Sequence, residues 1–255
     1  MPRAIWKGGI SFGLVYIPVK LYSGSQSHDV ELDMVRKGDN CPIKYIRVCK
    51  EDGKEVPYQD IVKGYKINDH YITLSDEDFR NASLSKSDSI TINEFVKVEE
   101  INPRFFEKPY LLEPDKGAGK TYNLLKQAIL KTGMAGLSKF TLRNREHLAL
   151  LMADEKVIYL TQMRFHDELR QPDDLKIPDT SPSKAEVDMA VKLIEGMTAP
   201  FHPEKYPDTY QETLQRVIQA KIENREILVK QTEPEESAIE DLMEQLKKSL
   251  ELATS

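Results

Sequence analysis

The chain has 255 residues, of which 40% are hydrophobic and 31% charged, and its formal net charge is −6. This length allows one large domain or two modest ones with a sizeable core, and the absence of a run of about eighteen apolar residues excludes a membrane-spanning helix. The first residues lack the apolar segment of a signal peptide, and Cys41 and Cys49 lack the spacing of zinc ligands, so we expect a cytoplasmic protein with reduced thiols and no metal.

Short strands separated by tight turns are predicted along the first hundred residues. Alternating or continuous apolar runs predict strands at 14–22, 32–36, 43–49, 61–67, 71–74 and 90–98. Pro18 indicates a sheet edge or a bulge, because proline has no N–H to donate. Asp52-Gly53 and Asn68-Asp69 predict hairpin turns. Ser75, with Asp78 three residues later, predicts the capped start of a short helix.

The stretch from 108 to 163 is expected to alternate strand, helix and strands. A strand over 109–112 and a turn at Glu113 to Gly117 precede a helix whose start Asp115 can cap or charge and that ends at Gly133. The apolar face of this helix consists of Ala118, Tyr122, Leu125 and Ile129. Further strands are expected at 137–142, 147–152 and 157–163. So many short strands predict a sandwich or a barrel, and only a barrel removes exposed strand edges.

Basic and acidic residues are segregated along the chain. Residues 1–50 and 101–170 each carry a net charge of +4, whereas 51–100, 171–230 and 231–255 carry −6, −3 and −5. A bound polyanion responds to charge within a Debye length of about 8 Å rather than to the total. The negative total therefore does not exclude nucleic acid, although mixed, solvated surfaces explain the same pattern.

Four sequence blocks carry a family resemblance. They are ISFGLVYIPVKLY from Ile10, RVCKEDGKEVPYQDIVKGY from Arg47, PYLLEPDKGAGKTYNLLKQAI with KTGMAGLSKFTLRNREHLALL from Pro109, and IEDLMEQLKKSLE from Ile239. In this order they resemble the bacterial Ku proteins, the homodimeric DNA-end-binding factors of non-homologous end joining. The resemblance implies a mainly β fold with helices (α+β), in which a Ku-type β-barrel core carries a C-terminal helical extension. It also implies that two copies form a ring around double-stranded DNA, without catalysis or a cofactor.

The DNA-contacting residues are expected on strands, or at their ends, within the two basic segments. We predict Lys20, Lys44, Arg47, Lys131, Lys139, Arg143 and Arg145. Their side chains would bind phosphates and would not read bases.

Three regions with different roles are expected. Residues 1–170 would form the DNA-binding barrel, and the proline-bearing linker and helical arm of 171–230 would dimerise. Ser183 with Glu186 forms a capping box for one helix of this arm, and Asp208 precedes the other. The acidic tail of 231–255 would recruit a ligase.

The tail is predicted to form an amphipathic helix. Its apolar face consists of Ile239, Leu242, Met243, Leu246 and Leu250. About sixteen residues make a marginal helix in water, so this face is expected to fold on a partner. The family resemblance implies the ATP-dependent end-joining ligase, ligase D. With a net charge of −5, the tail is not expected to add DNA affinity.

Other readings of the sequence are weaker. Gly119-Lys120-Thr121 resembles the end of a phosphate-binding P-loop, but Pro114 stands where the motif needs a glycine. Asp115, Asp154 and Lys156 match the pattern of a metal-dependent nuclease, which needs two carboxylates and a lysine to converge. A predicted turn at 153–156 would separate them. A third possible class of function is a β-barrel adaptor that binds only proteins and shows no DNA binding at any salt concentration.

Overall fold

A computed structural model describes residues 3–82, 88–143, 145–225 and 249. The chain divides into two compact units. The first consists of Met1–Ser27 and Asp33–Gln171, and the second of His28–Leu32 and Pro172–Ser255. In the part of the chain that the structure describes, no helix is long and apolar enough to cross a bilayer.

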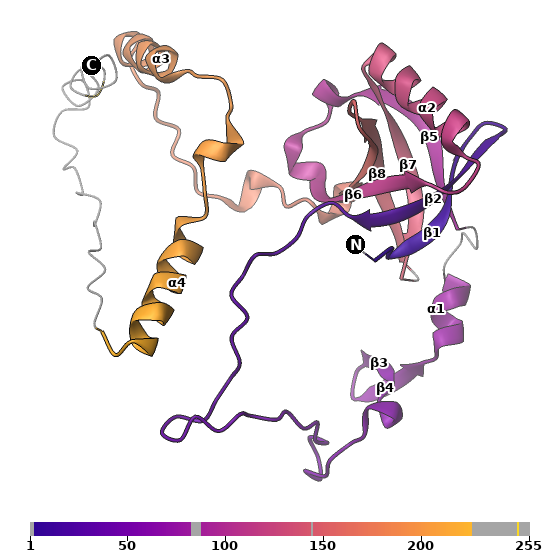
Figure 1. Ribbon diagram of the computed structural model, residues 1–255, viewed down its shortest axis with the longest axis vertical. Coiled ribbons are helices and arrows are strands. Elements are labelled where there is room, and N and C mark those ends of the chain that lie inside the picture. The colour runs from indigo at the N-terminus through magenta and orange to yellow at the C-terminus, as the bar shows by residue number, and fades with distance from the viewer. Residues whose placement is uncertain (1–2, 83–87, 144, 226–248, 250–255) are drawn as a thin grey trace. The chain divides into compact units, whose positions relative to one another are not determined.

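Seven strands of the first unit close into a barrel, in the order β1-β2-β6-β9-β8-β7-β5 (Figure 1). They are β1 (Trp6–Phe12), β2 (Val15–Ser23), β5 (Ser89–Lys97), β6 (Phe106–Pro114), β7 (Met134–Leu142), β8 (Arg145–Ala153) and β9 (Ile158–Met163). All neighbouring pairs are antiparallel except β1 and β5, which close the barrel as a parallel pair. The structure confirms the predicted barrel.

The barrel interior follows from the alternation of side chains along each strand. On β2, Ile17, Val19 and Leu21 are at most 1% exposed, whereas Tyr16, which precedes Ile17 on the opposite face, is 56% exposed. The carbonyl of Pro18 accepts the N–H of Asp115 where the pairing of β2 with β6 ends. The N and the C=O of one residue point to the same side of a strand, so the nitrogen of Pro18 also faces β6. Pro18 lies just beyond the last paired residues of β2 and β6, so its missing N–H removes no hydrogen bond from the ladder between these strands.

Helix α2 (Gly119–Thr132) covers one end of the barrel and buries Tyr122, Leu125 and Ile129. It ends as predicted at Gly133, which has φ +66° in the left-handed region that glycine adopts without strain. The expected capping by Asp115 is wrong, because Ala118 is the N-cap and the Asp115 carboxylate instead accepts the backbone N–H of Lys116.

A smaller apolar cluster lies on the outer face of β7, β8 and β9. Ala135, Leu150 and Met163 are its buried members. Phe105 and Ile101, from the connection between β5 and β6, pack against them. This connection therefore covers part of the barrel wall that alternation along the strands leaves apolar.

The described residues of the long connection between β2 and β5 form a two-stranded sheet, one short α-helix and a single-turn 3-10 helix. The sheet consists of β3 (Lys63–Ile67) and β4 (His70–Leu74), and the α-helix is α1 (Asp76–Ala82). The Asn68-Asp69 hairpin and the Ser75 cap are confirmed, since the Ser75 Oγ accepts the N–H of Asp78 at 3.2 Å.

The strands predicted at 32–36 and 43–49 are wrong. The structure has only isolated bridges there, between Val35 and Pro42 and between Val48 and Glu55. The apolar pattern predicted strands because it matches the composition of buried strands. A strand also needs a neighbouring backbone with which to form a ladder of hydrogen bonds, and these two segments pair only at isolated bridges. The turn at Gly53 is present, with φ +69°.

The second unit contains α3 (Lys184–Met197) and α4 (Thr209–Ile222). Both predicted caps are confirmed: Ser183 and Glu186 form a capping box, and Asp208 accepts the N–H of Gln211 at 3.1 Å.

Single-turn 3-10 helices occur in both units, at η1 (Tyr58–Asp60), η2 (Val98–Glu100), η3 (Pro103–Phe105), η4 (His166–Glu168), η5 (Pro172–Asp174) and η6 (Pro203–Lys205). The predicted ligase-binding residues Ile239, Leu242, Met243, Leu246 and Leu250 lie outside the described residues.

Candidate nucleic-acid interface

Lys20 and Lys139, two of the predicted DNA-contacting residues, stand on barrel strands and pair with carboxylates. On β2, Lys20 points outward, and its Nζ lies 3.4 Å from an Asp115 oxygen. Lys139 on β7 pairs with Glu146 on β8 at 2.8 Å. These are surface ion pairs, which are weak because water and salt screen them. A phosphate can therefore displace either carboxylate at little cost.

Lys44 and Arg47 belong to the segment that forms no ladder, so their predicted position on a strand is wrong. Both are exposed. The Arg47 guanidinium lies 5.0 Å from the centre of the Tyr58 ring, a cation–π contact that restricts the side chain. Lys131 is exposed in the last turn of α2, where its charge also complements the helix dipole.

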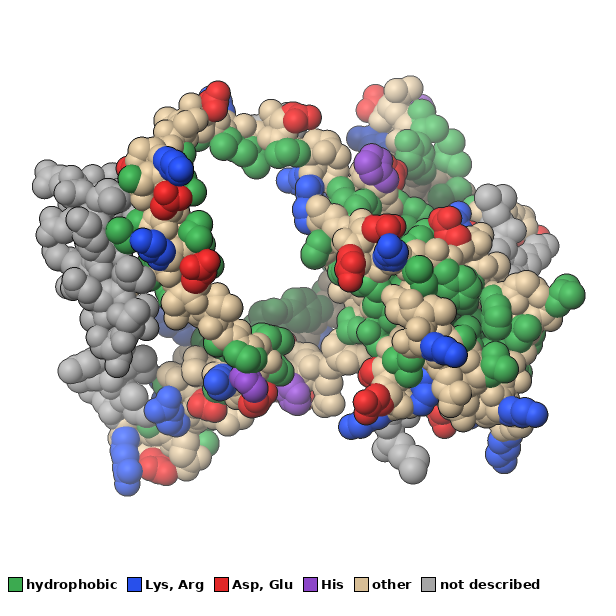
Figure 2. Space-filling view, turned by 90° about the horizontal axis from the view of Figure 1, so that it is seen from above, with side chains coloured by type: hydrophobic (Ala, Val, Ile, Leu, Met, Phe, Trp, Pro, Cys, Tyr) green, Lys and Arg blue, Asp and Glu red, His purple; other side chains and the backbone are tan. Residues whose placement is uncertain are grey.

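The α2 face of the barrel combines cationic and apolar side chains, as Figure 2 shows from above that face. Lys120 and Lys131 border a shallow depression that also contains Leu124, whose side chain is 59% exposed. Lysines beside exposed apolar groups suit a surface that contacts another molecule more than a purely solvated face.

Arg143 and Arg145 come together at the other end of the barrel, on either side of the β7–β8 turn. They line a cavity of about 370 Å³ together with Lys108 and His147. We call this the mouth cavity. Arg145 also pairs with Glu168 at 2.9 Å.

Sequence reasoning missed Lys108. Residues 108, 110 and 112 lie on the same face of β6, and Tyr110 and Leu112 are buried inside the barrel. This spacing puts Lys108 on the inner face, at the start of the strand. A lysine at an inward position is the signal that was available.

The pKa of His147 is lowered, first by burial and then by the positive charge of Arg145. The imidazole is therefore neutral at neutral pH and adds no charge to the mouth cavity. Its ring lies 5.5 Å from that of Phe140, centre to centre, which places it at the apolar floor.

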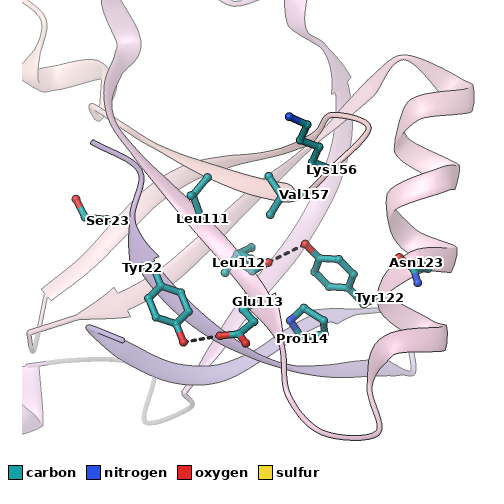
Figure 3. A pocket seen from close by; sticks show the side chains of 10 residues that line it. All are labelled: Tyr22, Ser23, Leu111, Leu112, Glu113, Pro114, Tyr122, Asn123, Lys156 and Val157. Carbon is teal, nitrogen blue, oxygen red and sulfur yellow. Dashed lines mark hydrogen bonds between the residues drawn. The ribbon is translucent and has the colours of Figure 1, made fainter. Parts of the chain in front are cut away.

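A separate groove of about 610 Å³ runs between α2 and the outer faces of β2 and β6 (Figure 3). Its wall includes Leu111, Lys156 and Glu113, and the Tyr22 hydroxyl donates to the Glu113 carboxylate. This bond raises the pKa of Tyr22, because it stabilises the neutral phenol next to a negative charge. The lining of the groove is otherwise largely apolar.

The nuclease alternative gains no support from the positions of its residues. One oxygen of Asp154 accepts the backbone N–H groups of Lys156 at 2.7 Å and Val157 at 2.8 Å, which closes the β8–β9 turn. Asp115 is engaged with Lys20. Among the described residues, no three His, Cys, Asp or Glu side chains gather as ligands for a metal ion.

Residues 11–189 match the family model described as the Ku70/Ku80 beta-barrel domain. The chain belongs to the Ku family. It is 44% identical over 253 residues to the non-homologous end joining protein Ku of Frankia casuarinae, covering 98% of this chain and 64% of that protein. The Ku proteins of Opitutus terrae (40% over 225 residues, 87% and 81% covered) and Archaeoglobus fulgidus (38% over 254 residues, 98% of each) are also similar.

The chain thus spans just under two thirds of the Frankia Ku protein and nearly all of the Archaeoglobus one. The predicted family and the predicted Ku-type α+β barrel are both confirmed. The names of these Ku proteins state a role in end joining and no enzymatic activity.

Proposed function

We propose that this chain is a non-catalytic DNA-end-binding protein of non-homologous end joining. Two copies form a ring that threads onto linear double-stranded DNA, protects the end, and recruits and stimulates the ATP-dependent end-joining ligase, ligase D. The observation that carries this proposal is the match of the closed barrel to the Ku family, whose curated relatives are named for end joining. This role places the protein in the cytoplasm, at the nucleoid.

Phosphate contacts supply the affinity. The predicted residues Lys20, Lys131 and Lys139 are exposed or half-buried and are either unpaired in the described part or held only by surface ion pairs. Binding of lysines and arginines to phosphates releases counterions and does not depend on base sequence. A closed ring makes a free end the condition for entry, so the protein recognises ends by topology.

A second copy is the partner that the exposed apolar segment fits. Between Leu32 and Ile72, the exposed large apolar side chains are Leu32, Met34, Val35, Ile43, Tyr45, Ile46, Val48, Tyr58, Ile61, Val62, Tyr65, Ile67, Tyr71 and Ile72. None of the described residues of β3 and β4 is buried, and an isolated two-stranded sheet is at best marginally stable in water. So many exposed large apolar side chains within one segment favour an interface over a purely solvated face.

Helices α3 and α4 add to this argument. Each has a capped, amphipathic sequence, but Ile194, Met197 and Tyr210 remain at least 65% exposed. We propose that 171–230 and the segment that contains β3 and β4 both contribute to the homodimer. Assembly would then bury apolar surface that the single chain leaves in water.

Competition between DNA forms tests the ring. A labelled linear duplex is bound to the protein, and unlabelled linear or relaxed circular DNA of the same sequence is added. The linear competitor is expected to displace the label and the circle is not, because a closed circle offers no end to enter. Equal competition by circles would contradict the ring and leave a surface-binding protein.

Light scattering tests the dimer. The protein at micromolar concentration is expected to have the mass of two chains, and Tyr71→Ser, which removes an exposed ring from β4, is expected to raise the dissociation constant. Leu14→Ser is the control, because Leu14 is also an exposed apolar residue but lies in the β1–β2 turn. A mass of one chain for the unmodified protein would contradict the assembly.

A further inference from the structure

The mouth cavity lies at the end of the barrel that α2 leaves uncovered. Helix α2 lies over the β8–β9 turn, since the Nζ of Lys126 donates to the carbonyl of Glu155 at 2.8 Å. Successive turns of an antiparallel sheet lie at opposite ends of the strands, so the β7–β8 turn with Arg143 is at the other end. Mouths of β-barrels are common sites for small ligands.

The rim of the mouth cavity has an excess of positive charge. Lys108, Arg143 and Arg145 line it. Within the described part of the chain, neither Lys108 nor Arg143 has a carboxylate partner within ion-pair distance, whereas Arg145 pairs with Glu168 at 2.9 Å. The rim therefore carries two cations without a carboxylate partner in the described part, and the Lys108 ammonium lies 5.8 Å from the centre of the Tyr110 ring.

The backbone of Arg143 adopts a conformation that arginine rarely takes. Its φ is +52°, in the left-handed region that L side chains other than Asn and Asp disfavour. Leu142 pairs with Arg145, so Arg143 is the first central residue of the β7–β8 hairpin, where the favoured two-residue turns require a positive φ. The hairpin therefore fixes the backbone of Arg143 at the rim of the mouth cavity.

The floor of the mouth cavity is aromatic and polar. The Tyr110 hydroxyl donates to the Gln162 Oε1 at 3.3 Å, and the Gln162 Nε2 donates to Glu107 at 2.9 Å. The Tyr110 and Phe140 rings meet edge to face with centres 6.4 Å apart. Glu107 and Glu168 are the acidic groups near the site, and each is engaged by a donor. The three cations of the rim outnumber them.

We infer that the mouth cavity binds a phosphate monoester, with Arg143 and Lys108 around the phosphate and the aromatic floor beneath the attached nucleoside. An arginine fork and a lysine are the side chains that bind phosphate most strongly. A phosphodiester inside a duplex is flanked on both sides and cannot enter a cavity within the barrel, whereas a terminal or free monoester can. The ligand is therefore a 5′-phosphate at a DNA end or a free nucleotide. This site does not depend on the proposed ring.

Calorimetric titration of the full chain with thymidine 5′-monophosphate tests the site, with thymidine as the comparison ligand. We expect saturable binding of the nucleotide and none of the nucleoside. Arg143→Gln and Lys108→Gln should each weaken binding about tenfold, because each removes a charge-assisted hydrogen bond. Lys97→Gln is the matched control and should leave binding unchanged, because Lys97 is an exposed lysine at the opposite end of the barrel, where β5 pairs with the start of β7.

Arg143→Gln and Lys108→Gln change residues on different elements. If circular dichroism shows that one variant is misfolded, nucleotide binding by the other variant still tests the site. Equal binding of thymidine, no saturable binding of the nucleotide, or an equal loss in Lys97→Gln would overturn the inference.

Short linear duplexes with either a 5′-phosphate or a 5′-hydroxyl then identify the source of the monoester by competing with the nucleotide. Competition by the phosphorylated duplex alone assigns the site to DNA ends, and competition by neither assigns it to free nucleotides. Both results support a monoester site. Equal competition by the two duplexes would refute it, because internal phosphates would then suffice.

Discussion

The hydroxyl of Tyr122 joins α2 to the barrel, and removing it should cost considerable stability. It donates to the Leu112 carbonyl and accepts the Ile158 N–H, both at 2.7 Å. Tyr122 is 4% exposed, and Leu112 and Ile158 are both 0% exposed. Tyr122→Phe therefore leaves a buried N–H without this acceptor, at about 1–3 kcal/mol, and removes the bond to the carbonyl, at about 1 kcal/mol. We expect a loss of about 2–4 kcal/mol in the free energy of unfolding.

Urea unfolding followed by tryptophan fluorescence measures this loss. Trp6, the single tryptophan of the chain, lies on β1 and reports on the barrel. The midpoint should fall with an unchanged slope, and Tyr16→Phe, a change on the exposed outer face of β2, should stay within about 0.5 kcal/mol of the unmodified protein. A loss below about 1 kcal/mol for Tyr122→Phe would refute the role of this hydroxyl in holding α2 to the strands.

Three further predictions concern DNA, the ligase and pH. Fluorescence anisotropy should show the logarithm of affinity for a linear duplex falling with the logarithm of salt by about 0.9 per phosphate contacted, and a flat dependence would contradict the electrostatic role of the lysines and arginines. Deletion of 231–255, or Leu242→Ala together with Leu246→Ala, should leave duplex binding nearly unchanged and abolish stimulation of the ligase; loss of DNA binding would show that the segment has another role. The pKa of Asp154 lies below its ordinary 3.8, first because the Val157 N–H stabilises the charged carboxylate. The contribution of the Asp154 carboxylate to stability is therefore present above pH 3.8 and is lost as the pH falls through the lowered pKa. The difference in urea midpoint between Asp154→Asn and the unmodified protein should therefore shrink on acidification below 3.8, and a constant difference would contradict this assignment.

Local chemistry in the sequence determined most of the elements. The alternation along β2, the hairpin at Asn68 and the Ser183 capping box depend on residues that are neighbours along the chain. Gly133 ended α2 as predicted because its lack of a Cβ allows the left-handed conformation. The sequence blocks also identified the family, and with it the barrel.

Only the tertiary structure decided which distant residues meet. The parallel pairing of β1 with β5 joins segments that no local pattern connects, and the apolar runs at 32–36 and 43–49 found no strand to pair with. The registers of β6 with β9 and of β7 with β8 bring Lys108 and Arg143 to one cavity. Periodicity gives the face on which a side chain lies, whereas its neighbours across a barrel depend on pairings between strands far apart in sequence.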